Sequence, residues 1–237
     1  MLKTDLHLHT HFSNCGLHSI LEVINQAINV GLEIIAITDH GPALGGRVSG
    51  VFFERFNNPY KEITVFKGLE LNLTDKPGET DLPLHLLPFL DVILVGIHPT
   101  TPQGLTKDEY TDMLIKVIQN NKYIDIISHP NSKEYPLDFE KLAKEASKFG
   151  VALELNNSKT HLKRVDDKIT KQLITACINN NCQMVINSDS HAITEIGNGK
   201  SVKPFLKELN FPDTLLLNSD VEKVRKFIQN RKNNKVI

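Results

Sequence analysis

Near the N-terminus the chain reads Lys-Thr-Asp-Leu-His-Leu-His at residues 3–9, a short β-rich run that ends in two histidines. Similar apolar runs, most of them followed by a histidine or an acidic residue, return along the rest of the chain. The runs are more continuous than alternating, which is typical of parallel strands that are covered on both faces. We therefore predict strands at residues 3–9, 34–38, 64–69, 92–97, 124–128, 151–155 and 184–187.

Amphipathic helical patterns separate the predicted strands. They lie at residues 20–30, 107–120, 138–149 and 166–180, and a tail adds an apolar run at 215–217 and a final helix at 221–231. Regular alternation of strand and helix predicts βαβ units with right-handed crossovers, and hence an α/β fold. No linker rich in Ser, Gly or Pro interrupts the pattern, so we expect residues 1–237 to form a single domain.

Composition narrows the possible classes of function. The formal net charge of −1 gives no field that would hold a polyanion, so we do not expect a nucleic-acid partner. No stretch approaches 18 continuous apolar residues and the N-terminus lacks the layout of an export signal, which predicts no membrane association. Three cysteines at spacings that suggest no disulfide framework favour a reducing, cytoplasmic location. The sequence does not indicate an oligomeric state.

The polar residues at the strand ends favour closure of the sheet. In a parallel barrel the loops after the carboxyl ends of the strands gather around one mouth, whereas an open sheet spreads them along an edge. Imidazole and carboxylate groups are preferred ligands of zinc and similar ions. Six strand ends could bring such ligands together only in a barrel, so we predict closure and a metal site at the C-terminal ends of the strands.

The individual motifs leave plainer alternatives open. His7 and His9 lie two residues apart on a strand and share a face, where they can chelate one ion or stand on a solvated rim. Asp39 could orient an imidazole or cap a helix. Glu70 could bridge two ions with its two oxygens, or it could be exposed in a loop.

The later motifs also contain possible metal ligands. His98 and His129 each precede a proline, which disfavours helical backbone and predicts an extended conformation at both histidines. Asp189 and His191 repeat the one-residue spacing of the first histidine pair with mixed ligand types. Each motif is modest alone, but their joint placement at strand ends favours a metal site.

The motifs also resemble a known family. In chain order they are Asp-Leu-His-Leu-His-Thr at 5–10, Ile-Thr-Asp-His-Gly-Pro at 37–42, Gly-Leu-Glu at 68–70, Gly-Ile-His at 96–98, Ile-Ser-His-Pro at 127–130 and Ser-Asp-Ser-His at 188–191. This set resembles the PHP (polymerase and histidinol phosphatase) family, and Leu-Glu-Leu-Asn-Asn-Ser at 153–158 resembles its stand-alone bacterial phosphatase branch. The resemblance implies a distorted seven-stranded (β/α)7 TIM-like barrel with three divalent metal ions, usually zinc and sometimes manganese or iron.

The resemblance also implies a set of metal ligands. One ion would take His7, His9, Glu70 and Asp189; a second would share Glu70 and add His98 and His129; a third would take His40, His191 and one residue after His9. Relatives usually place a histidine where this chain has Cys15. Because a thiolate is a competent zinc ligand, we favour Cys15 for the third ion, with His18 and His11 as alternatives and a buried inert thiol as the plain reading.

We expect a phosphatase that cleaves small phosphate monoesters by in-line attack of a metal-bridging hydroxide. Asp189 or His191 would assist proton transfer, and His40 would lie near the leaving group. Four residues that follow the predicted strand at 151–155 could touch a phosphate, or they could belong to a plain charged loop: Lys159, His161, Lys163 and Arg164. The alternatives are a nuclease or phosphodiesterase with the same cluster, and a regulatory module whose metal only stabilises the fold. A serine or cysteine nucleophile has no sequence support.

Overall fold

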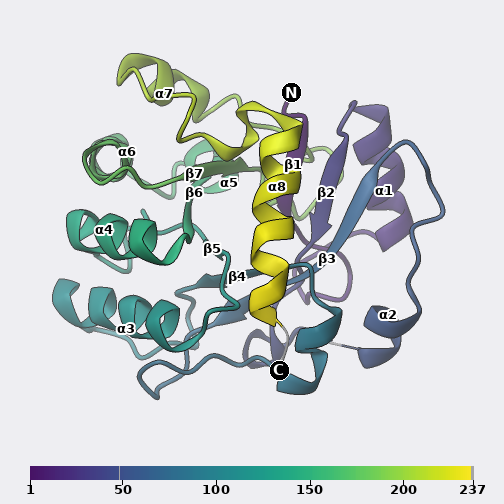
Figure 1. Ribbon diagram of the computed structural model, residues 1–237, viewed down its shortest axis with the longest axis horizontal. Coiled ribbons are helices and arrows are strands. Elements are labelled where there is room, and N and C mark those ends of the chain that lie inside the picture. The colour runs from purple at the N-terminus through teal and green to yellow at the C-terminus, as the bar shows by residue number, and fades with distance from the viewer. Residues whose placement is uncertain (48, 236–237) are drawn as a thin grey trace.

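Seven parallel strands form a single sheet in the computed structural model, which describes residues 1–47 and 49–235 (Figure 1). The strands follow one another in chain order across the sheet, so every neighbour is joined by a crossover. Their bounds are β1 Thr4–Leu8, β2 Ile34–Ile37, β3 Thr64–Asn72, β4 Val92–Gly96, β5 Ile126–Ile127, β6 Ala152–Asn156 and β7 Met184–Asn187. All seven predicted strands are therefore present.

The first and last strands approach each other and nearly close the barrel. Leu8 pairs with Ser190 in an isolated parallel bridge, and the His9 backbone N–H donates to the Ser190 carbonyl at 2.9 Å. The buried Asp5 carboxylate accepts the backbone N–H groups of Ser188 and Gly197, each at 3.0 Å. Side chains thus replace much of the backbone ladder between β1 and β7. The predicted barrel is confirmed.

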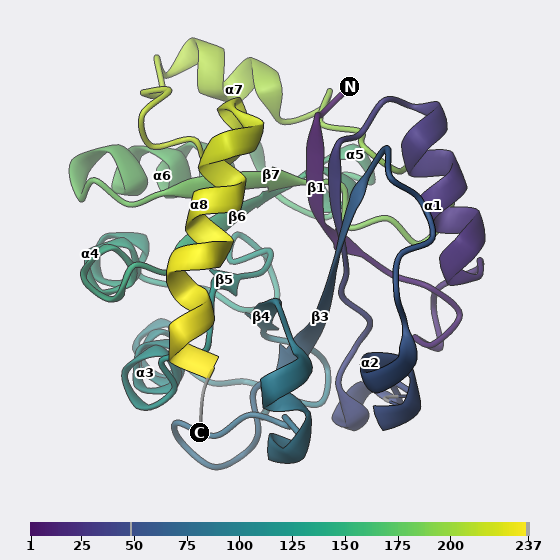
Figure 2. The same ribbon diagram turned by 45° about the vertical axis from the view of Figure 1, so that its right-hand side comes forward.

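Helices surround the outside of the barrel (Figures 1 and 2). Their bounds are α1 Ile20–Asn29, α2 Gly50–Arg55, α3 Lys107–Asn120, α4 Phe139–Phe149, α5 Asn157–His161, α6 Asp167–Asn179, α7 Lys203–Glu208 and α8 Val221–Lys232. Capping boxes at Ser19 and Thr106 fix the starts of α1 and α3, and Asp138 and Asp166 cap α4 and α6. No described helix is both long and apolar enough to cross a membrane.

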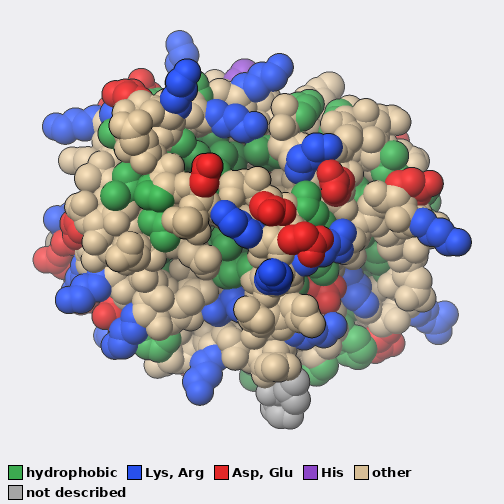
Figure 3. All heavy atoms as spheres, turned by 45° about the horizontal axis from the view of Figure 1, so that its top comes forward, with side chains coloured by type: hydrophobic (Ala, Val, Ile, Leu, Met, Phe, Trp, Pro, Cys, Tyr) green, Lys and Arg blue, Asp and Glu red, His purple; other side chains and the backbone are tan. Residues whose placement is uncertain are grey.

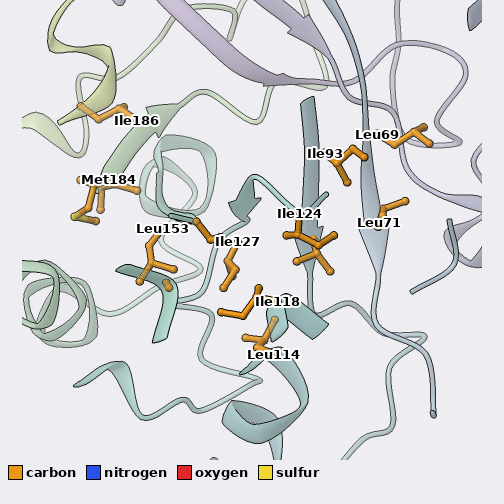
Figure 4. Close-up of a cluster of buried hydrophobic side chains, with 14 of the residues drawn as sticks. Leu69, Leu71, Ile93, Leu114, Ile118, Ile124, Ile127, Leu153, Met184 and Ile186 are labelled. Atoms are coloured by element: carbon orange, nitrogen blue, oxygen red, sulfur yellow. The ribbon is translucent and has the colours of Figure 1, made fainter. Parts of the chain in front are cut away.

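Two apolar layers hold these elements together. The larger one lies between the strands and the outer helices, where Ile127 of β5 lies beside Leu114 and Ile118 of α3, and Leu71 and Ile93 belong to the same cluster (Figure 4). The smaller one is formed by the alternate strand residues, Leu6, Ile34, Ala36, Val92, Leu94, Ile126, Ala152 and Val185. Val224, Phe227 and Ile228 of α8 pack against this second set, so α8 covers one end of the barrel.

A buried carboxylate anchors α8 at the amino-terminal end of the strands. Asp125 is fully buried and receives Arg231 Nε at 2.7 Å, Lys235 Nζ at 2.8 Å and the Ile93 backbone N–H at 2.8 Å. Arg231 also donates to the Gly150 carbonyl at 2.7 Å. Each charge therefore has partners that compensate for its burial.

The structure differs from the sequence predictions in several bounds. β3 continues to Asn72, so Glu70 lies inside a strand and not after its end. β5 covers only two residues, because an oxygen of Asp125 takes the Ile93 N–H that a longer ladder would bind. The predicted run at 215–217 contributes one bridge, between Leu216 and Met184, and no strand. The short helices α2, α5 and α7 had no predicted counterpart.

Candidate metal centre

Strand ends deliver a dense group of polar side chains to the mouth opposite α8. The group contains the nine residues that the sequence analysis favoured as metal ligands: His7, His9, Cys15, His40, Glu70, His98, His129, Asp189 and His191. Most of these side chains are buried, whereas His191 is half-buried and Cys15 is exposed. Histidines and acids are seldom buried together unless they pair or bind an ion.

Glu70 stands at the centre of the group and is fully buried. Four imidazoles approach its two carboxylate oxygens, with distances to Oε2 of 3.2 Å from His7 Nε2 and 2.9 Å from His40 Nδ1, and to Oε1 of 3.3 Å from His98 Nε2 and 2.9 Å from His129 Nε2. The two oxygens therefore face different histidines, and Oε1 also accepts a hydrogen bond from Ser128 Oγ at 2.7 Å. The alternative of an exposed loop residue is excluded by this burial.

A second group of close ligand atoms involves His7 of β1 and His9 just after that strand. His7 Nε2 and His9 Nε2 are 3.1 Å apart, and Asp189 Oδ1 lies 3.5 Å from the first and 3.2 Å from the second. Glu70 Oε2 lies 3.5 Å from His9 Nε2. These separations are those of atoms arranged around a common point, as the ligand atoms of one metal ion would be.

A third set lies nearer the surface. Ligand atoms of His9, Cys15, His40 and His191 are all within 4.8 Å of one another. Neither His11 nor His18 belongs to such a set among the described residues. The geometry thus brings Cys15, of the three residues considered from the sequence, to the place where a third ion would be held.

Several buried polar atoms in this region have no hydrogen-bond partner. They are His40 Nδ1, Glu70 Oε2 and both ring nitrogens of His98. His40 Nδ1 and Glu70 Oε2 lie 2.9 Å apart but lack the directions of a hydrogen bond. Buried polar atoms without partners are costly, and a bound cation would satisfy donors of this chemistry. The residues present therefore fit divalent metal ions.

The same proximity shifts the pKa values of the buried groups. Burial alone would lower the pKa of His7, but the carboxylates of Glu154, Glu70 and Asp189 raise it well above its usual range. Burial would raise the pKa of Glu70, yet the surrounding histidines hold it well below its ordinary value. In the metal-free protein these two groups are thus a charged pair.

The pKa values of the outer set are also shifted toward the charged forms of its residues. Burial lowers the pKa of His40, but Glu70 and Cys15 raise it to about 10. Burial raises the pKa of Cys15, but hydrogen bonds from His191 and His40 lower it to about 6. A thiol with a pKa near 6 is mostly thiolate at pH 7, which is the form that binds zinc.

Two of these residues have unusual backbone conformations. His129 has a φ of 32° and Asp189 a φ of 51°, both in the left-handed region that non-glycine residues seldom adopt. The prediction of an extended His129 is therefore wrong. Its backbone N–H donates to Glu154 Oε2 at 2.8 Å while its ring reaches Glu70, and these two contacts outweigh the preference set by the following proline.

Asp39 acts on the histidines through a serine. Ser13 Oγ donates to Asp39 Oδ1 at 2.6 Å, receives the His40 backbone N–H at 2.9 Å and lies 3.2 Å from His9 Nδ1. The suggested role in orienting an imidazole is thus indirect. Ser13 was not predicted, because its place in the loop after β1 gives no periodic signal. Glu154 was also missed, since it reads as one more residue of a buried strand.

A cavity of about 470 Å³ opens above the group. Its floor contains Glu70, His98 and His129, and Lys159 and Arg164 stand at its wall beside the apolar Leu44 and Leu162. Lys159 follows the cap of α5, where Asn156 Oδ1 accepts the Lys159 backbone N–H at 2.9 Å. The cavity therefore joins a ligand-rich floor to cationic and apolar walls.

Comparison with known proteins gives consistent matches. The family profile of the PHP domain matches residues 5–210. A probable phosphatase of Acetivibrio thermocellus is 32% identical over 234 residues, which cover 96% of this chain and 95% of that protein. Among solved structures, a histidinol phosphate phosphatase of Lactococcus lactis in complex with zinc, L-histidinol and phosphate aligns with a TM-score of 0.59 at 20% identity, covering 97% of this chain and 93% of that one.

One further structural match shows that the fold alone does not fix an activity. A chain of an archaeal ribonuclease P structure with mature tRNA aligns with a TM-score of 0.60 at 16% identity, covering 96% of this chain and 91% of that one. The function must therefore be argued from the site.

Proposed function

The chain belongs to the PHP domain family, and from this premise we propose that it is a metal-dependent phosphatase acting on small phosphate monoesters. The observation that carries the proposal is the buried carboxylate of Glu70, whose two oxygens face different histidines while Oε2 and nearby ring nitrogens have no hydrogen-bond partner. Full-length relatives called probable phosphatases support the same class of reaction.

The proposed ligand sets correspond to the three groups of close ligand atoms described above. His7, His9, Asp189 and Glu70 would hold one ion, and Glu70 would be shared with a second ion held by His98 and His129. His40, His191 and Cys15 would hold a third. When bound, divalent ions of this kind acidify water to give a nucleophile near pH 7 and neutralise the phosphoryl oxygens. We favour zinc because the outer set includes a thiolate.

The chain's own residues would position the ester and move protons. The Lys159 and Arg164 side chains at the cavity wall would bind phosphoryl oxygens, and Leu44 and Leu162 would contact the organic part of the ester. His191 is half-buried and lines the cavity, so it can exchange a proton with solvent, with Asp189 Oδ1 at 3.7 Å from its Nδ1. His40 also lines the cavity and would lie near the leaving group. A cavity of about 470 Å³ suits a small ester.

A nuclease with the same cluster is the second candidate, and the net charge argues against it. The formal net charge of the chain is −1, and on the face in Figure 3, which is not the face of the mouth, Lys and Arg side chains are mixed with Asp and Glu. Binding of a nucleic-acid backbone generally needs a continuous basic surface. A purely structural metal is a weaker reading still, because structural zinc sites are closed cages whereas this group lines an open cavity.

Phosphate release from a panel of small esters, including p-nitrophenyl phosphate, tests the proposal. We would compare metal-free protein with protein loaded with zinc, manganese or iron, and run a labelled single-stranded oligonucleotide in parallel. We expect metal-dependent release of inorganic phosphate from at least one monoester and no cleavage of the oligonucleotide. Cleavage of the oligonucleotide alone would support the nuclease, and no reaction with any loaded form would refute an enzyme of this class.

A further inference from the structure

Glu154 lies on β6 behind the proposed metal ligands, is fully buried, and lines no part of the cavity above the group. It receives four hydrogen-bond donors. Oε1 accepts from His7 Nδ1 at 2.7 Å and Asn187 Nδ2 at 2.9 Å, and Oε2 accepts from the His129 backbone N–H at 2.8 Å and Asn156 Nδ2 at 2.9 Å. Every acceptor direction of the carboxylate is thus used by a group of this chain.

The contact with His7 fixes which ring nitrogen carries the proton. An ionised carboxylate can only accept, so Nδ1 of His7 must donate to Glu154. When the ring is neutral, as metal binding requires, Nε2 therefore carries the lone pair, and it is this atom that lies 3.1 Å from His9 Nε2 and 3.2 Å from Glu70 Oε2. The hydrogen bond therefore aims the metal-binding nitrogen into the group.

The contact with His129 maintains a strained backbone. The φ of 32° at this residue is costly for a side chain with a Cβ, and its N–H is held by Glu154 in that conformation. The same conformation brings His129 Nε2 within 2.9 Å of Glu70 Oε1. Loss of this acceptor would release the strain and withdraw the ring.

A third connection passes through Asn156. Its Nδ2 donates to Glu154 Oε2 at 2.9 Å and to Asp189 Oδ2 at 3.0 Å. This leaves Asp189 Oδ1, the oxygen nearest the paired histidines, without that amide. Glu154 is thereby linked to residues of both inner ligand sets.

We propose that Glu154 is a positioning residue that sets the tautomer of His7, the backbone of His129 and the orientation of Asp189, and so fixes the affinity of the two inner metal ions. This inference rests on the proposed metal centre. It does not depend on which ester is the substrate.

Glu154→Gln is the most direct test. A glutamine has nearly the same volume, but its amide nitrogen must face two donors whichever way the side chain turns. The matched control is Asp125→Asn, which alters a carboxylate that is equally buried and receives three donors at the opposite end of the barrel. Zinc affinity is measured by competition with a chromophoric chelator, retained zinc by elemental analysis after dialysis, and stability by denaturant unfolding of the metal-free proteins.

We expect E154Q to bind the inner zinc ions about 10- to 100-fold more weakly than wild type, as is typical when a partner of a metal-binding histidine is lost. D125N should lose stability and keep its zinc affinity. Unchanged zinc affinity in E154Q overturns the proposal, and so does an equal loss in D125N, because the effect would then be general destabilisation. If wild type itself binds no zinc, the metal centre fails and not merely the role of Glu154.

A second variant decides the matter if E154Q does not fold. Asn156→Ser leaves Glu154 in place and can still cap α5, but a serine is too short to reach both carboxylates. We expect a smaller but measurable loss of zinc affinity in N156S. Affinity equal to that of wild type would contradict the link from Glu154 to Asp189.

Discussion

Each end of the barrel buries a carboxylate, but the two carboxylates have different kinds of partner. At the amino-terminal end Asp125 is matched by Arg231 and Lys235, and its oxygens accept donors from three groups. At the carboxyl-terminal end Glu70 has histidines and Ser128 Oγ around it and no Lys or Arg partner among the described residues, and its Oε2 has no hydrogen-bond partner. Both side chains are fully buried.

The difference separates stability from function. A saturated ion network such as that of Asp125 holds elements together and leaves no site for a ligand. A group in which buried nitrogens and oxygens converge without partners costs stability and is retained for what it binds. Substitutions at the two ends should therefore have opposite signatures, one in unfolding and the other in metal binding and catalysis.

The largest expected effect is on catalysis at the unsaturated end. Glu70→Gln removes the charge that both inner ions would share, and the loss of several kcal/mol of transition-state stabilisation corresponds to a fall in kcat of about 1000-fold or more. Phosphate release by zinc-loaded protein measures it. A variant that retained more than a tenth of wild-type activity would show that the two ends do not differ in this way.

The next largest effect is expected on stability, at the amino-terminal end of the barrel where Asp125 is buried. Arg231→Ala leaves Asp125 with only Lys235 as a charged partner, so we expect the free energy of unfolding to fall by about 3 kcal/mol. Urea unfolding of the metal-free protein gives this value. Zinc affinity of the folded variant should equal that of wild type, and a parallel fall in zinc affinity would contradict the separation of the two ends.

A smaller effect is expected at the rim of the metal centre. Cys15→Ser removes the thiolate of the exposed third set, so affinity for one ion should fall by about 10-fold, a loss like those seen on disturbing other metal-site contacts, while two ions remain. Zinc counting after dialysis measures this, and Cys15→His should restore the third ion. Three tightly held ions in C15S would point to a ligand other than Cys15.

The smallest expected effect is the release of protons when zinc binds. With a pKa of about 10, His40 is protonated at pH 7 in the metal-free protein, and the pKa of His7 is also raised. Because an imidazole must be neutral to bind a metal, zinc binding should release about one to two protons, and apparent affinity should rise with pH through neutrality. Titration calorimetry in buffers of different ionisation enthalpy measures the release. Arg231→Ala should give the same count, and zero release would contradict the charged state of this group.

Much of this arrangement could be predicted from the sequence, because buried parallel strands read as continuous apolar runs and their ends carry the polar residues. The bounds of β7 and α3 agree residue for residue with the prediction. What escaped prediction depends on contacts distant in sequence. Glu154 contacts His7 across 147 positions, and Arg231 contacts Asp125 across 106. The φ of His129 likewise follows from Glu154 and not from its own neighbours.

The short helices were not predicted for a different reason. Helices α2, α5 and α7 span five or six residues each, which is too few for a periodic apolar stripe to emerge. Helix α5 in particular carries Lys159 to the cavity wall. Lys159 was already a possible phosphate contact from the sequence, but the helix that carries it was not predicted.

The position of α8 has a consequence for biosynthesis. Residues 221–232 are translated after all seven strands, yet Val224, Phe227 and Ile228 cover the apolar interior that those strands enclose. A nascent chain paused before this helix leaves the ribosome would therefore expose Leu6 and its neighbours to water and to chaperones. Synthesis of the final helix, and not of the last strand, completes the interior of the molecule.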